Sequence, residues 1–185
     1  IYYSLSYMIN VLYLDDESHN LTAFRAAFRR DFQVHVTTEP TEAVRILREQ
    51  PIEVIISDQK MPSLSGVEFF ELIMPDNPDP VRMLLTGHAD IDAVIDAINK
   101  GQIYKYISKP WNEAELKSLV EEAAALYHQR KVMAREGQQL ITKMDEARVF
   151  ARRIQQLTAD GFPATPESRA EIANLADQID RLLQS

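Results

Sequence analysis

Cysteine is absent from the 185 residues, so the chain has neither a disulfide framework nor a thiolate metal site. No apolar run approaches the roughly 20 residues of a membrane span. The opening residues, IYYSLSYM, lack the basic flank and long apolar stretch of a signal peptide. Acidic residues outnumber basic ones by 28 to 20, and no basic stripe marks a nucleic-acid-binding surface. We therefore expect a cytoplasmic protein that binds neither nucleic acid nor membrane.

The chain does contain enough apolar residues, 45%, for an ordinary folded core. Five short apolar runs alternate with amphipathic segments; the runs are Ile9–Leu14, Phe32–Thr37, Val54–Ser57, Val81–Leu85 and Ile103–Ile107. Helix-like periodicity follows each run, beginning near Ser18, Thr41, Gly66, Ile91 and Asn112. Consecutive apolar positions are typical of parallel strands covered on both faces. The alternation predicts an α/β fold with a doubly wound, five-stranded parallel sheet of the flavodoxin-like kind.

Polar and charged residues follow four of the five predicted strands. Asp15-Asp16-Glu17 follows the first, Asp58 the third, Thr86-Gly87 the fourth, and Ser108-Lys109-Pro110 the fifth. Because the carboxyl ends of parallel strands meet at one edge of a sheet, these groups should converge where such folds bind ligands. Converging carboxylates recruit a cation, and an oxygen-only donor set suits Mg²⁺ or Mn²⁺. A carboxylate nucleophile, a metal, a lysine and a hydroxyl are the parts for phosphoryl transfer to an aspartate.

The same motifs carry a family resemblance over about residues 8–128. They are "DD" after the first strand, "SDQKMP" with Gly66 after the third, "TG" after the fourth and "YISKP" after the fifth. Together they resemble the receiver domain of two-component response regulators, in the version that reads "KPW". The resemblance implies a phospho-accepting signalling switch that catalyses only its own phosphorylation and dephosphorylation and is otherwise no enzyme. We therefore expect a receiver domain at 8–128, preceded by an N-terminal remnant or extension at 1–7 and followed by a helical extension at 129–185.

The resemblance further implies a phosphoacceptor and a metal site. Asp58 would accept phosphate from the phosphohistidine of a sensor histidine kinase. Asp16 and Asp58 would bind Mg²⁺ (or Mn²⁺) through their side chains and Lys60 through its backbone carbonyl. Asp15 would contribute directly or through a bound water. The Lys109–Pro110 peptide bond would be cis, as X-Pro bonds in tight turns can be.

Other residues would hold the phosphoryl group and transmit its arrival. Thr86 and Lys109 would hold the phosphoryl oxygens. Thr86 would move toward the phosphate and Tyr106 would rotate into the vacated space, which makes these two residues the switch. Lys60 and His88 would flank the path of the hydrolytic water and tune the lifetime of the phosphoryl group. A half-buried strand tyrosine without a switch role is the ordinary alternative for Tyr106.

The C-terminal part of the chain reads as two helices. Residues 112–157 contain no proline, and apolar residues recur there at alternating intervals of four and three, as in a coiled-coil seam. The members are Leu119, Ala123, Leu126, Met133, Leu140, Met144, Ala147, Ala151 and Ile154, interrupted by Arg130 and Gly137. After the turn "ADGFPATPES" a second amphipathic stripe runs from Ile172 to Leu183. We expect either a homodimer through these helices or a hairpin in which the second helix folds back on the first.

Two other functions are compatible with the same residues. An aspartyl-nucleophile, metal-dependent phosphohydrolase would use the same parts, but such enzymes usually carry a second aspartate where this chain has Lys60. A phosphate-independent interaction module would leave the acidic site without a role, which the complete set of site residues argues against.

Overall fold

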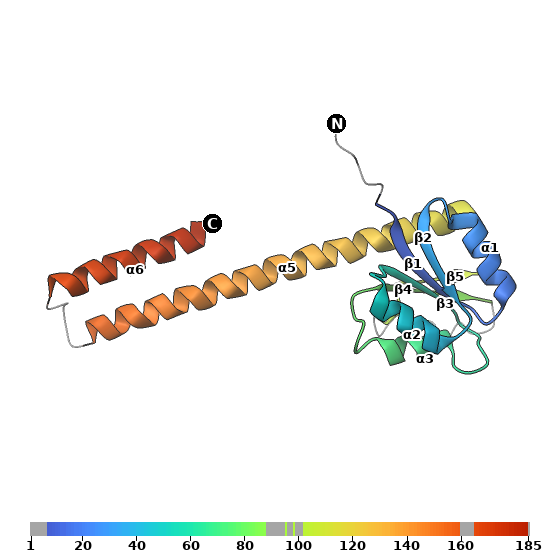
Figure 1. Ribbon diagram of the computed structural model, residues 1–185, viewed down its shortest axis with the longest axis horizontal. Coiled ribbons are helices and arrows are strands. Elements are labelled where there is room, and N and C mark those ends of the chain that lie inside the picture. Colours follow the sequence, from blue (N-terminus) through green and yellow to red (C-terminus); the bar gives the residue numbers. More distant parts are fainter. Residues whose placement is uncertain (1–6, 88–94, 96–97, 99–101, 160–164, 185) are drawn as a thin grey trace, which may run out of the picture. The chain divides into compact units, whose positions relative to one another are not determined.

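The computed structural model describes residues 7–87, 95, 98, 102–159 and 165–184. Five parallel strands form one sheet in the order β2-β1-β3-β4-β5; they are β1 (Ile9–Leu14), β2 (Phe32–Thr37), β3 (Val54–Asp58), β4 (Val81–Thr86) and β5 (Lys105–Ser108). The helices are α1 (Ser18–Phe28), α2 (Pro40–Glu49), α3 (Gly66–Ile73), α5 (Glu113–Thr158) and α6 (Pro166–Gln184) (Figure 1). The predicted fold class is confirmed. The amphipathic segment predicted from Ile91 falls almost wholly outside the described residues.

Side-chain alternation along the strands divides the core into two layers. Residues i and i+2 of a strand point to the same face of the sheet, so Val11 and Tyr13 of β1 pack with helices α1 and α5. Leu12 and Leu14 face the opposite way and pack with α2 and α3. All four side chains are fully buried. Strands covered on both faces are continuous apolar runs for this reason, which is why the sequence pattern located them.

Two strands extend one residue further than predicted, and the fifth is shifted. Asp58 pairs with Leu85 at the end of β3, and Thr86 pairs with Ser108 at the end of β4. The polar residues expected just beyond these strands are therefore their last paired residues. The fifth strand was predicted at Ile103–Ile107 but runs Lys105–Ser108. Ile103 is buried because it packs in the core layer of α2 and α3, not because it belongs to the strand.

The N-terminus of α3 lies against the end of β3. Ser65 caps the helix by accepting from the backbone N–H of Glu68, whose carboxylate in turn accepts from the backbone N–H of Ser65. This capping box satisfies two otherwise unpaired donors. The next residue, Gly66, donates its backbone N–H to the carbonyl of Gln59 at 3.1 Å. A Cβ on Gly66 would overlap the main-chain oxygen of Asp58 and the Leu84 side chain, so this close approach requires glycine.

A histidine of α5 contacts the residue that precedes β3. Nε2 of His128 lies 2.6 Å from Oε1 of the buried Glu53, although not in hydrogen-bonding orientation. The other carboxylate oxygen of Glu53 accepts from the backbone N–H of Asn10 at 2.8 Å. The hydroxyl of Tyr7 is 2.8 Å from the same His128 nitrogen. These contacts tie the N-terminal part of α5 to the amino-terminal edge of the sheet.

The chain divides into two compact units, Ile1–Lys131 and Val132–Ser185. In the second unit α6 folds back along the last turns of α5 (Figure 1), and Arg153 of α5 pairs with Glu171 of α6 at 2.9 Å. The α5 side chains half-buried there include Ala147, Phe150, Ile154 and Leu157. This face is shifted from the predicted seam, of which Leu140 and Met144 are exposed. No helix in the described ranges is long and apolar enough to cross a membrane.

The fit of α3 against β3 predicts the effect of one methyl group. Gly66→Ala should lower the free energy of unfolding of the first unit by about 2 kcal/mol, because the added Cβ forces backbone apart in a packed region. Urea unfolding followed by the fluorescence of Trp111, the single tryptophan, measures this. Gly137→Ala is the matched control, since a Cβ there meets no atom within 4 Å, and it should leave the Trp111 transition unchanged. Equal midpoints for Gly66→Ala and the wild type would show that α3 does not approach β3 so closely.

Candidate functional site

The carboxyl ends of β1, β3 and β5 converge on one ammonium group. Nζ of Lys109, which follows β5, donates to Oδ2 of Asp15 at 2.9 Å and to Oδ1 of Asp58. The carboxylate side chains are 1% and 9% exposed, and the Lys109 side chain is 27% exposed. A buried carboxylate is costly without a partner, and one lysine serves as that partner for both.

Asp15 accepts hydrogen bonds from several groups besides Lys109. The Tyr13 hydroxyl donates to its Oδ2, and Nδ2 of Asn20 donates to both of its oxygens at 3.0 and 3.1 Å. The backbone N–H of Glu17 donates to Oδ1 at 3.0 Å. Burial acts to raise the pKa of Asp15, but these hydrogen bonds outweigh burial and lower its pKa below the ordinary value. Asp15 is therefore held as a carboxylate.

Tyr13 and Asn20 were not among the residues predicted from sequence. Tyr13 is fully buried, and burial together with its bond to Asp15 raises the pKa of its phenol, so it stays a donor. The signal for Tyr13 was present, since residues i and i+2 of a strand share a face. Asn20 lies in the first turn of α1, five residues from Asp15, and no spacing rule singles it out.

Asp58 is in the opposite electrostatic situation. Its Oδ2 accepts from the backbone N–H of Lys60 at 2.7 Å, in addition to the contact with Lys109. Burial raises the pKa of Asp58, and the bonds from Lys109 and Lys60 only partly offset that rise. The nearby negative charge of Asp15 raises it further. Folding therefore favours ionised Asp15 and works against ionised Asp58.

The segment after β5 is fixed at several points. The Lys109–Pro110 peptide bond is cis, as predicted, and the backbone N–H of Lys109 donates to the carbonyl of Thr86 at 2.9 Å. Trp111 packs against Phe24 and Phe28 of α1, with ring centroids 6.2 and 5.6 Å apart. Burial acts to lower the pKa of Lys109, but its bonds to Asp58 and Asp15 outweigh burial and raise it. The ammonium is therefore charged and positioned from both sides.

Thr86 lies at the same edge, at the end of β4. Its side chain is buried and its Oγ1 donates to the carbonyl of Gly87 at 2.9 Å. Tyr106 of β5 is 43% exposed, and no hydrogen bond joins it to Thr86 among the described contacts. The structure thus places Thr86 at the site and Tyr106 on the surface nearby.

The remaining predicted site residues lie around this centre or beyond the described chain. Asp16 and Lys60 are exposed, and Asp16 lines a hollow with Thr38, Met61 and Pro62. In the part of the chain that the structure describes, no three acidic, His or Cys side chains converge as a metal cluster. His88 lies outside the described residues.

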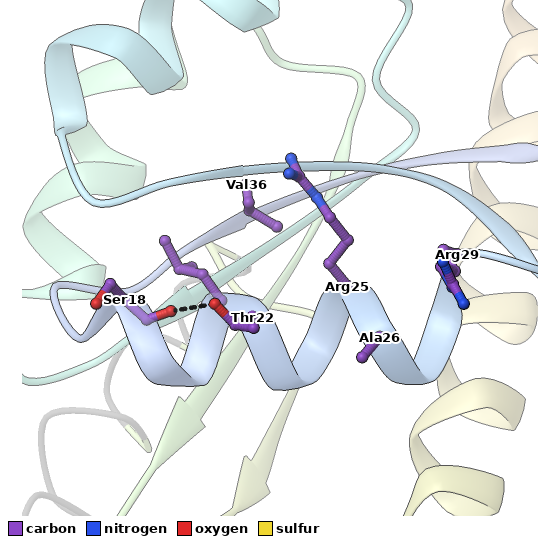
Figure 2. Close-up of a pocket in the computed structure, with 7 residues that line it drawn as sticks. Ser18, Thr22, Arg25, Ala26, Arg29 and Val36 are labelled. Atoms are coloured by element: carbon purple, nitrogen blue, oxygen red, sulfur yellow. Dashed lines mark hydrogen bonds between the residues drawn. The ribbon is translucent and has the colours of Figure 1, made fainter.

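A separate hollow lies between α1 and β2. It is lined by Ser18, Leu21, Thr22, Arg25, Ala26, Arg29 and Val36. Figure 2 shows the two arginines at one end and the hydrogen bond from Thr22 to the carbonyl of Ser18 at the other. The lining contains no carboxylate or imidazole. This hollow therefore offers no counterpart to the chemistry of the Asp15–Asp58–Lys109 centre.

The opposed pKa shifts predict opposite effects of two isosteric substitutions. The pKa of Asp58 is raised on folding, so wild-type stability falls as the pH rises through it, and Asp58→Asn should be more stable at pH 7 by about 1 kcal/mol. The pKa of Asp15 is lowered, so its contribution is complete above the unfolded value near 4 and is lost as the pH falls. Asp15→Asn should therefore be less stable at pH 7 by a similar amount.

Urea unfolding between pH 3 and pH 7.5, in metal-free buffer, tests this pair. Both differences should shrink toward the acid end of this range, because protonation removes the charges that cause them. A destabilised Asp58→Asn at pH 7, or a stabilised Asp15→Asn, would contradict the assigned directions.

Comparison with known proteins gives this arrangement a family. The model of the response regulator receiver domain matches residues 11–121. The hydrogenase transcriptional regulatory protein HoxA of Bradyrhizobium diazoefficiens is 37% identical over 121 residues, 65% of this chain and 25% of that protein. The phosphoglycerate transport system regulator PgtA of Salmonella typhimurium is 29% identical over 156 residues, 80% of this chain and 37% of that protein. The chain thus spans only a quarter to about a third of these relatives.

Solved structures agree with the sequence comparison. A response regulator receiver domain protein from Clostridium thermocellum has a TM-score of 0.61 and 31% identity, covering 68% of this chain and 99% of that one. The beryllofluoride-activated NtrC4 receiver domain dimer has a TM-score of 0.59 and 28% identity, covering 64% and 98%. With its five-stranded parallel sheet and its acidic edge, the chain belongs to the response regulator receiver domain family.

Proposed function

We propose that this chain is a phospho-accepting switch in which Asp58 takes the phosphoryl group from the phosphohistidine of a sensor histidine kinase. The observation that carries the proposal is the position of Asp58. It is the last residue of a buried strand, it contacts a charged lysine, and folding disfavours its ionised form. The negative charge of such a carboxylate is poorly compensated. When the carboxylate attacks as a nucleophile, that charge passes to a group that is better stabilised, and this favours the reaction.

In the proposed transfer, an Asp58 carboxylate oxygen attacks phosphorus as the phosphorus–nitrogen bond to the kinase histidine breaks. The Oδ2 oxygen is already oriented by the backbone N–H of Lys60. Lys109 would move from the carboxylate to an oxygen of the bound phosphoryl group, and the Thr86 hydroxyl would turn from the Gly87 carbonyl to donate to another. Each of these donors is already at the sheet edge, so little rearrangement is required.

The donor set fits a hard divalent cation. Asp15 and Asp58 are bridged by Lys109, and Asp16, the residue after Asp15, is exposed. We assign Mg²⁺, or Mn²⁺, to Asp15, Asp16, Asp58 and the backbone carbonyl of Lys60, because oxygen ligands suit these ions. The ion would supply charge compensation for the phosphoryl oxygens.

Two further roles stay within this proposal. Tyr106, exposed on β5, would turn inward when Thr86 moves toward the phosphate, which changes the surface around β5. The exposed cation of Lys60, with His88, would set the lifetime of the phosphoryl group. Residues 8–128 would act as the receiver and 129–185 as its helical output, which dimerises or binds a partner. Relatives such as HoxA and PgtA are named as transcriptional regulators, but those are longer proteins.

Phosphorylation by a small donor tests the proposal directly. With acetyl phosphate and Mg²⁺, the intact protein should gain one phosphoryl mass, because a receiver catalyses its own phosphorylation. Asp58→Asn should gain none, and wild-type protein in EDTA should gain none. Intact-mass spectrometry, with peptide mapping after borohydride trapping, measures this.

Asp31→Asn is the matched control, since Asp31 belongs to the same unit but pairs with Lys117 on the surface. It should be labelled like the wild type. Lys109→Met should be labelled at least tenfold more slowly, on the scale of removing one electrostatic contact to the transferring group. Labelling of Asp58→Asn equal to that of the wild type would refute the assignment of Asp58.

A further inference from the structure

The second unit leaves an apolar stripe of α5 uncovered. Met133, Leu140 and Met144 are 62%, 59% and 46% exposed. With Gly137 they repeat at intervals of four, three and four residues, so they share one face of the helix. Exposed apolar residues scattered singly are ordinary, but a continuous stripe at helical spacing indicates a missing helical neighbour.

This stripe adjoins the face that α6 already covers. Ala147, Phe150, Ile154 and Leu157 of α5 are half-buried there, and Arg153 pairs with Glu171 across the same contact. At 100° of rotation per residue, the centres of the two faces lie roughly 90° apart around α5. A helix in a four-helix bundle has neighbours at about this separation. One neighbour of α5 is therefore present in the chain and the second is missing.

Two charges beside the stripe have no ion-pair partner among the residues that the structure describes. Exposed Glu136 and half-buried Lys143 both lie on the side of the stripe that is turned toward α6, and among the described contacts neither forms an ion pair. Other charged residues of this segment do, since Arg148 pairs with Asp145 at 3.0 Å. Their opposite signs and their spacing of seven residues point to the neighbour that would complete them.

We propose that the missing neighbour is α5 of a second copy of this chain, packed antiparallel. Aligning the stripe with an antiparallel copy of itself sets Met133 against Met144 of the second copy and Gly137 against Leu140. In that register Glu136 faces Lys143 of the second copy, and two-fold symmetry repeats the pair. The inference deepens the output role given above to the helical extension, and it names the partner and the orientation.

Gly137 is explained by this arrangement. Glycine is unfavourable inside a helix compared with alanine, and a Cβ there would meet no atom of the chain within 4 Å. Nothing in the described part of the chain therefore requires glycine at this position. In the antiparallel pair it faces a leucine at the centre of the contact, where a missing side chain lets two helices approach closely.

The same charges disfavour the parallel arrangement. In a parallel pair in register, flanking residues meet partners five positions further along the second helix. Lys143 would then face Arg148 of the second copy, and Glu136 would face Ile141. Like charges beside a helical seam are destabilising, so charge complementarity selects the antiparallel orientation.

Disulfide trapping tests the orientation. Because the chain contains no cysteine, every disulfide that forms must involve an introduced cysteine. Met133→Cys and Met144→Cys chains, oxidised alone, should form few disulfide dimers, because equivalent residues lie about 16 Å apart along the axis in the antiparallel pair. A mixture of the two variants should form disulfide dimers efficiently. Efficient trapping of either variant by itself, with no gain on mixing, would overturn the proposal in favour of a parallel pair.

Charge exchange tests the pairing in the full-length chain by sedimentation equilibrium at low salt. Glu136→Lys and Lys143→Glu should each weaken the dimer about tenfold, because each converts two symmetric attractions into repulsions. The double variant should return to within threefold of the wild type. Glu146→Lys, the same change on an exposed position off the stripe, should have little effect. A wild type monomeric at all concentrations, a Lys143→Glu that strengthens the dimer, or a double variant no better than the singles would overturn the proposal.

These experiments are run without phosphate donor, and again with Asp58→Asn. Because the antiparallel contact uses only residues of α5, the pattern should be the same in both. If trapping fails while Asp58 is labelled normally, only the dimer proposal is refuted. If trapping succeeds while labelling fails, only the assignment of Asp58 as phosphoacceptor is refuted.

Discussion

The ammonium group of Lys109 contacts two buried carboxylates that are 94 and 51 residues away in sequence. Without it, folding the sheet would bring like charges together at one edge with little water to solvate them. The cis peptide bond after Lys109, the hydrogen bond from its backbone to Thr86 and the packing of Trp111 on α1 all position this one side chain. The geometry of the acidic edge depends on that lysine.

The two carboxylates that share the lysine are not equivalent. Asp15 is surrounded by donors from Tyr13, Asn20 and the Glu17 backbone, so its charge is satisfied before Lys109 is counted. Asp58 has one backbone donor besides the lysine. This asymmetry leaves the charge of Asp15 well satisfied and the charge of Asp58 incompletely compensated, which costs folding stability.

Much of the fold could be predicted because its signals are local. The strands β1 and β2 were located to the residue, since continuous apolar runs bounded by polar residues determine strands covered on both faces. The fifth strand was misplaced because Ile103 is buried for a tertiary reason that the pattern cannot distinguish from strand burial. The site residues Asp15, Asp58, Thr86 and Lys109 were predicted from their positions at strand ends. The donors around Asp15 were not, because a side chain that supports another has no motif of its own.

The helical part shows what sequence periodicity cannot determine. Alternating intervals of four and three identified an apolar seam on α5, but the seam does not say which helix covers which part of it. In the structure α6 takes a neighbouring face. The residues that remain exposed are informative for that reason, because they are the part of the apolar seam that α6 does not bury.

The contact of His128 with Glu53 has a consequence for how a change at the acidic edge can travel. Glu53 immediately precedes β3 and Asp58 ends it, about 17 Å apart along an extended strand. The central strand is thus anchored at both ends, by the sheet and α5 at one and by Lys109 at the other. Sliding of β3 is a poor route for a signal. Among the described strands, β5 lies at the edge of the sheet with Tyr106 exposed, so a displacement of β5 disturbs the pairing with one neighbouring strand, β4.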